Sequence, residues 1–161
     1  MDDEFFEVFG AIGWGEFWNF SEYPSSKLLT LEFMSIVKAT KTSIYFHLCG
    51  YEFNFESEQF SACLGFINCT TNIELATKNL NKQEFWYEIT RENIFGKAQP
   101  CTSHIFHPTL RFMNKWMGVT IFPRDDIWTV REIVSRILYA IVHKICISPI
   151  KAMVQYWIAA P

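Results

Sequence analysis

Two short segments in which an apolar residue recurs at every second position constrain the fold of this chain more than any other feature. They are separated by Cys49-Gly50, and a two-residue turn there would join them as an antiparallel hairpin. This turn pairs Leu48 with Tyr51, Phe46 with Phe53 and Ile44 with Phe55, and it places all six side chains on one buried face. We therefore expect a β-hairpin over about residues 43–56, packed on helices because a two-stranded ribbon is marginal alone.

Helical spacing of apolar residues and capping signals predict helices on both sides of this hairpin. The clearest follows a capping box at Thr129-Val-Arg-Glu132, after which apolar residues continue at helical spacing to Ile141. Further helices are expected at 5–12, from Ser25 or Ser26 to about 38, and at 57–64, 81–90, 108–120 and 149–158. Trp14, Phe17, Trp18 and Phe20 form an aromatic cluster before Pro24. The expected fold is α+β, a predominantly helical single domain over residues 1–161 with one antiparallel hairpin.

The composition excludes a disordered chain and indicates an incompletely covered core. Half of the 161 residues are hydrophobic and 17% are aromatic, which is ample for a packed interior. Only 19% are charged, against about 25% in ordinary globular proteins. We interpret this deficit as apolar surface covered by a missing segment or a partner, so we expect the chain to be a fragment of a longer product.

The location that the sequence predicts is the cytoplasm or the nucleus. The five cysteines are irregularly spaced and odd in number, and the acidic start MDDEFFEVF lacks the positive region of a secretory signal. Reduced thiols in a protein that is not secreted are therefore expected. Charged residues and Pro149 interrupt the apolar stretch from 133 to 160, so we expect a buried helical hairpin and no membrane partner.

The chemistry-bearing residues do not form a recognisable catalytic or metal-binding motif. Cys101, His104 and His107 recur every third residue, but a zinc site needs a fourth ligand, and His107 before Pro108 suits the start of a helix. Asp125-Asp126 is interpreted as a turn whose charge favours the helix after Thr129. Protease, hydrolase and phosphate-loop motifs are missing from the sequence. We expect no catalytic residue, metal, cofactor or small-molecule substrate.

The basic residues of the C-terminal part are the candidate binding site. Residues 1–90 carry 5 basic and 13 acidic side chains, whereas residues 91–161 carry 9 basic and 4 acidic ones. Cations mixed with tryptophans suit phosphate contact and base stacking, so a nucleic-acid site is predicted at Arg111, Lys115, Arg124 and Arg131, near Trp116 and Trp128. The wider basic set also includes Arg91, Lys97 and Arg136. The alternative is that these side chains pack their stems around a helical core and that the charge asymmetry is uneven solvation.

Several short segments follow one another in a recognisable order. They are Gly13-Trp14, Leu31-Glu-Phe33, Ile44-Tyr-Phe-His-Leu-Cys-Gly50, Phe60-Ser-Ala-Cys-Leu-Gly-Phe66, Ser103-His-Ile-Phe-His-Pro108-Thr-Leu-Arg111-Phe, Thr120-Ile-Phe-Pro-Arg124 and Val130-Arg-Glu132. In this order they resemble the first, gag-like open reading frame of Athila-group plant LTR retrotransposons. The likeness covers roughly residues 10–150, and Ile133 departs from the family's usual Leu. The hairpin-then-helix unit also looks like the plant mobile domain. The resemblance implies no catalytic residues.

The sequence therefore leaves two alternative functions. The first is a non-enzymatic gag-like retrotransposon protein that self-associates and contacts RNA. The alternative is a host-adopted interaction module, similar to the plant mobile domain, that binds a protein without nucleic acid. A continuous basic face would favour the first, and an exposed apolar groove with an acidic rim would favour the second.

Overall fold

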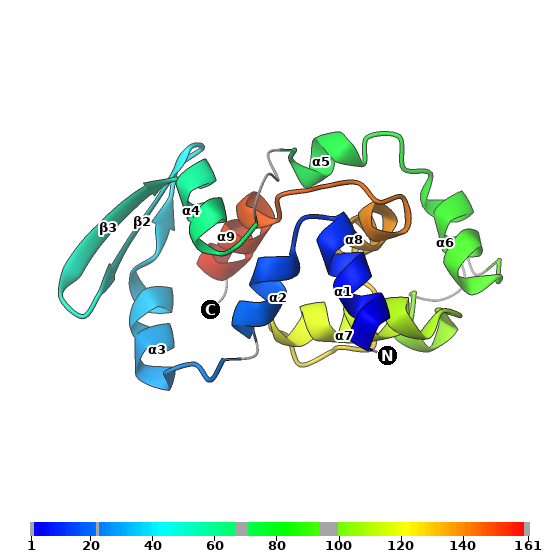
Figure 1. Ribbon diagram of the computed structural model, residues 1–161, viewed down its shortest axis with the longest axis horizontal. Helices are drawn as coiled ribbons and strands as arrows, with labels where there is room; N and C mark the ends of the chain where they lie inside the picture. The colour runs from blue at the N-terminus through cyan, green and yellow to red at the C-terminus, as the bar shows by residue number, and fades with distance from the viewer. Residues whose placement is uncertain (1, 22, 67–70, 94–99, 160–161) are drawn as a thin grey trace.

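The computed structural model of the chain describes residues 2–21, 23–66, 71–93 and 100–159. Within these residues the fold is α+β and mostly helical, as predicted, with a small antiparallel sheet at one end of the molecule (Figure 1). The helices are α1 (Asp2–Ala11), α2 (Gly15–Ser21), α3 (Lys27–Ile36), α4 (Ser57–Cys63), α5 (Ile73–Ala76), α6 (Lys82–Thr90), the 3-10 turn η1 (Thr102–His104), α7 (Pro108–Val119), α8 (Glu132–Val142) and α9 (Ile150–Ala159). The strands are β1 (Lys38–Ala39), β2 (Ser43–Leu48) and β3 (Tyr51–Glu56).

The predicted hairpin is formed by β2 and β3, and its register is confirmed. Leu48 pairs with Tyr51, Phe46 with Phe53, and Ile44 with Phe55. Cys49 and Gly50 have φ angles of 53° and 80°, so both central residues lie in the left-handed region that the tightest hairpin turns require. The sheet has one strand more than predicted, because the short β1 pairs antiparallel with β2 in the order β1-β2-β3.

The apolar face of the hairpin is buried at its base but not at its tip. Ile44 and Phe46 are 2% and 6% exposed, whereas Tyr51 is 72% exposed. The prediction that all six paired residues are buried is therefore wrong for Tyr51, and it holds only in part for Leu48, Phe53 and Phe55, which are half-buried. The physical reason is the length of the ribbon: its tip projects past the helices that cover its base (Figure 1).

One part of the core lies where α1, α2, α7 and α8 meet, and aromatic rings of α1, α2 and α7 pack together there. The Phe9 ring lies 4.7 Å from the Trp18 ring and 4.9 Å from the Trp116 ring, measured between centroids. Trp14 is fully buried, and its indole N–H donates to the Ile147 carbonyl at 2.8 Å. The aromatic cluster exists, but its residues belong to α2 and the turn before it, and Phe20 is half exposed.

Several helix starts follow the predicted signals. Ser26 caps α3, and Asn81 caps α6 by accepting the Gln83 N–H at 3.1 Å. Pro108 lies in the first turn of α7 with His107 at the N-cap, as expected. The α4 helix begins at the predicted Ser57, but Glu56 is its N-cap.

The predicted capping box at Thr129 is wrong. Arg131, not Thr129, occupies the N-cap of α8. Thr129 is instead held in an isolated antiparallel bridge to Cys101, and its N–H donates to Asp126 Oδ1 at 3.2 Å. Asp126 therefore closes a turn, as expected, but this turn precedes α8 by several residues and does not lie at its N-terminus.

The apolar C-terminal stretch forms α8 and α9. Val134, Ile137 and Leu138 of α8 are fully buried, and α9 buries Met153 and Val154. In the part of the chain that the structure describes, no helix is both long enough and apolar enough to cross a membrane.

Candidate functional site

The α3 helix is attached to the sheet through one side only. On that side, the Phe33 ring lies 5.0 Å from the Phe46 ring of β2 and 5.5 Å from the Trp157 ring of α9. Ser26 begins the helix by accepting the Leu29 N–H at 3.5 Å. Every residue of α3 is exposed or only half-buried, so its other side faces away from the protein.

The outer face of α3 combines two leucines with two opposite charges. Lys27, Leu28, Leu31 and Glu32 are three or four residues apart in three pairs, so they share one side of the helix. Leu28 is 79% exposed and Leu31 is 57% exposed. Lys27 lies at one end of the leucine pair and Glu32 at the other. We call these four residues the α3 outer face.

Two of the four predicted nucleic-acid-binding residues are used inside the protein. Arg111 Nε and Nη2 donate to the Ile105 carbonyl at 3.1 and 2.8 Å. Arg124 Nη2 donates to the Thr129 carbonyl at 2.8 Å, and burial of this guanidinium lowers its pKa. Both arginines therefore hold loop backbone against α7, which supports the interpretation that they pack around the helical core.

The other two predicted residues lie on the surface near Trp128. Lys115 Nζ is 4.5 Å from the centroid of the Trp128 ring, and that ring is 55% exposed. Arg131 is exposed and close enough to Arg124 for its charge to contribute to lowering the pKa of Arg124. The structure thus brings Lys115, Arg124 and Arg131 to one region around loop 123–131, whereas the guanidinium of Arg111 is turned toward Ile105.

Acidic side chains accompany the basic ones, both in this loop and in the wider basic set. Asp125 and Asp126 are exposed within the same loop. Arg136 donates to Glu132 at 3.0 Å and to the Thr77 hydroxyl at 2.9 Å. Arg91 ends α6 in the left-handed conformation, and Lys97 lies outside the described residues.

The Cys-His series in the loop before α7 has local structural roles. The Ser103 hydroxyl donates to Cys101 Sγ at 3.5 Å, and hydrogen bonds from Ser103 lower the pKa of this thiol. His107 occupies the N-cap of α7, and its Nε2 lies 3.7 Å from Glu4 Oε1. Among the described residues, no three Cys, His, Asp or Glu side chains come close enough to hold a metal ion.

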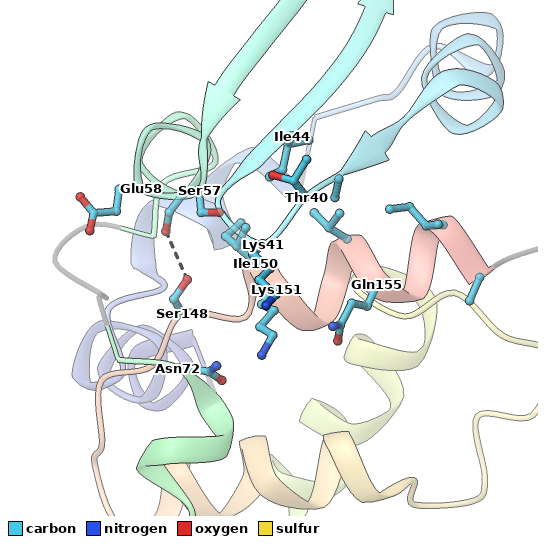
Figure 2. Close-up of a pocket in the computed structure, with 15 residues that line it drawn as sticks. Thr40, Lys41, Ile44, Ser57, Glu58, Asn72, Ser148, Ile150, Lys151 and Gln155 are labelled. Carbon is cyan, nitrogen blue, oxygen red and sulfur yellow. Dashed lines mark hydrogen bonds between the residues drawn. The ribbon is translucent and has the colours of Figure 1, made fainter.

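A groove that sequence reasoning missed lies between the turn joining β1 to β2, α4 and α9. Its volume is about 640 Å³. Figure 2 shows the labelled residues around it, with Lys41 on the sheet side and Lys151 and Gln155 on α9. The lining residues come from 39–61, Asn72 and 148–159, so they are distant in sequence and no local motif could have indicated the groove.

Comparisons of the chain with protein-family models, with curated proteins and with solved structures found no match. The resemblance to gag-like retrotransposon proteins therefore remains a prediction. The functional argument depends on the surfaces described above.

Proposed function

We propose that this protein is a non-enzymatic, gag-like assembly protein that self-associates through the α3 outer face. The observation that carries the proposal is the exposure of Leu28 and Leu31 on a helix whose opposite side is already packed. Leu28 and Leu31 have the i, i+3 spacing with which one face of an amphipathic helix contacts another surface.

The charge arrangement of the α3 outer face suits a second copy of the same helix. In a two-fold symmetric contact, the same residues meet from both sides. An antiparallel pair of α3 helices centred between residues 29 and 30 places Leu28 opposite Leu31 of the second copy. The same pairing places Lys27 opposite Glu32 of the second copy, so both the apolar and the charged groups are self-complementary.

This contact is small, so the expected association is weak. A helix of ten residues is about 15 Å long, and a single helix pair buries less than the roughly 1,600 Å² of a standard stable interface. Weak contacts of this kind suit assemblies in which many copies are held near one another, because effective concentration then adds to the affinity.

Sedimentation velocity over a series of increasing protein concentrations tests the proposal. The wild-type chain is expected to associate as its concentration rises, and the double variant Leu28→Ser/Leu31→Ser to remain monomeric. Leu75→Ser is the matched control, because Leu75 is a 63% exposed leucine on α5, away from α3. A wild-type chain that stays strictly monomeric at the highest concentration would contradict the proposal.

RNA contact is the second candidate, and the exposed Trp128 ring beside Lys115 favours it. A base stacking on Trp128 while Lys115 or Arg131 contacts a phosphate would give salt-dependent binding. Titration with oligouridine is expected to show about tenfold weaker binding for Trp128→Ala, because one stacked base contributes roughly 1–3 kcal/mol. Tyr87→Ala is the control, because Tyr87 is an exposed aromatic residue on α6.

A chain that stays monomeric and binds no RNA would favour the alternative function, a host-adopted interaction module.

A further inference from the structure

The groove between the sheet and α9 has apolar and basic lining residues. Among the apolar ones, Ile44, Ile150 and Val154 are only 2–3% exposed over their whole surface. Ile158, also in the lining, is 48% exposed. A volume of about 640 Å³ lies within the range of roughly 300–1,000 Å³ that small-molecule sites occupy.

The lining also carries two ammonium groups from separate elements. Lys41 lies in the turn between β1 and β2, and Lys151 lies in the first turn of α9. Figure 2 shows both side chains toward the middle of the groove. Lys151 Nζ lies 3.4 Å from Glu74 Oε2, whereas no ion pair links Lys41 to an acidic side chain in the described part of the chain.

Hydroxyl groups complete the polar part of the lining. Ser61 and Ser148 lie with their Oγ atoms 3.5 Å apart, the contact drawn as a dashed line in Figure 2. The carboxylate of Glu58, the one acidic group among the lining residues that the structure describes, is turned away from the two lysines (Figure 2). Because Glu74 opposes Lys151, Lys41 is the one ammonium group of the described lining that no carboxylate opposes.

We propose that this groove binds a small organic monocarboxylate with an aliphatic body. The carboxylate lies between Lys41 and Lys151, and the aliphatic chain lies along Ile44, Val154 and Ile158. The single unopposed ammonium group, that of Lys41, matches one carboxylate better than a doubly charged phosphate. Burial of the aliphatic chain against Ile158, the most exposed of the three apolar side chains, supplies affinity at about 25 cal/mol per Å² removed from water.

Glu74 gives the proposal a specific consequence. Its carboxylate competes with a bound carboxylate for Lys151, because both need the same ammonium group. Removing the charge of Glu74 should therefore strengthen binding, although the substitution removes an ion pair from the protein. A site held together only by apolar contact would not respond in this way.

Isothermal titration with sodium octanoate, kept below its micelle-forming concentration, tests the site. We expect saturable binding at one site per chain. The neutral 1-octanol and inorganic phosphate should each bind at least tenfold more weakly, because octanol lacks the carboxylate and phosphate lacks the aliphatic chain. Lys41→Gln/Lys151→Gln should weaken octanoate binding at least tenfold, Ile158→Ser severalfold, and Glu74→Gln should strengthen it at least twofold.

Lys82→Gln is the matched control, because Lys82 is an ion-paired lysine on α6 that does not line the groove. Its octanoate affinity should equal that of the wild type, and circular dichroism checks that every variant is folded. Three results would overturn the proposal: no octanoate binding by the wild-type chain, equal binding of octanol, or unchanged octanoate binding by Lys41→Gln/Lys151→Gln. None of the lining residues belongs to α3, so these outcomes are independent of self-association.

Discussion

The helical body and the hairpin end of this molecule are built with different degrees of burial. In the body, α7 buries seven of its twelve residues. At the other end, every residue of α3 and of β3 is exposed or half-buried. Exposed apolar side chains occur in both regions, such as Phe106 and Trp128 in the body and Leu28 and Leu31 on α3. The hairpin end differs because its outer helix buries no residue at all, and this is why we assign self-association to the hairpin end.

One side chain holds much of the hairpin end together. The Phe46 ring lies between 5.0 and 6.0 Å from four other rings, which are those of Phe33, Phe53, Phe55 and Phe60. In the body, the rings of α1, α2 and α7 form a separate network, in which Trp18 also contacts four other rings. Among the described residues, no ring belongs to both networks, so the loss of packing caused by a substitution should stay within its own region.

The largest expected effect comes from breaking the body at Trp14. Trp14→Ala removes a fully buried ring and the hydrogen bond to the Ile147 carbonyl, so it should lower the free energy of unfolding by about 3–5 kcal/mol. Urea denaturation followed by circular dichroism measures the loss. A change below about 1 kcal/mol would mean that the body does not depend on this aromatic core.

The next effect is local to the hairpin end. Phe46→Ala should lower the free energy of unfolding by about 3 kcal/mol, the lower end for a buried aromatic, because neighbouring Phe53 and Phe55 are only partly buried. Amide hydrogen exchange should show faster exchange in β2, β3 and α3 while α7 and α8 keep their protection. Equal acceleration in all helices would contradict the contrast between the two regions.

A smaller effect is expected in the loop that packs on α7. Thr102 is fully buried, donates to the Trp128 carbonyl at 2.8 Å and accepts from the Asn114 amide at 2.5 Å. Thr102→Val removes both of these hydrogen bonds, but the Trp128 carbonyl keeps the Thr102 N–H and the Asn114 amide keeps the Ile127 carbonyl. We therefore expect a loss of about 1 kcal/mol in the free energy of unfolding, measured in denaturant. Thr109→Val, which removes another buried hydroxyl that bonds only to Glu4 at the surface, should cost less.

The smallest effect is a dependence of stability on acid pH. Hydrogen bonds from Lys82 and then Arg136 lower the pKa of Glu132 below its ordinary value. The unfolded chain therefore binds a proton there more readily, so the stabilisation is present above about pH 4.3 and is lost as pH falls through the lower folded pKa. Because the pair is exposed, we expect less than about 1 kcal/mol. Glu132→Gln should be less stable than the wild type at neutral pH, and the difference should vanish in acid.

Regular patterns in the sequence predicted those parts of the fold that depend only on residues close to one another in the chain. The hairpin register follows from the two-residue period and the two-residue turn, and the structure confirms it. The exposure of Tyr51 could not be predicted, because it depends on how far the covering helices reach. The predicted capping box at Thr129 is wrong because contacts with Cys101 and Thr102, which are distant in sequence, hold residues 128–130 in an extended conformation.

The candidate sites were less predictable than the fold. Charge and spacing selected Arg111 and Arg124, but the carbonyl groups that they bind are set by loop conformation. The groove draws its lining from three separate segments, so only the folded chain brings Lys41 and Lys151 together. The α3 outer face was present in the sequence as apolar helical spacing, but a pattern alone does not show which side of a helix is covered.

The most direct test of the central claim, self-association through the α3 outer face, is a charge exchange across the antiparallel pair. Lys27→Glu and Glu32→Lys each place like charges opposite each other, so each variant alone should associate less than the wild type in sedimentation velocity. Mixing the two variants restores both opposite-charge pairs, so the mixture should associate again, as should the double variant Lys27→Glu/Glu32→Lys. Equal association of both single variants and the wild type, or a mixture no more associated than its components, would contradict the account.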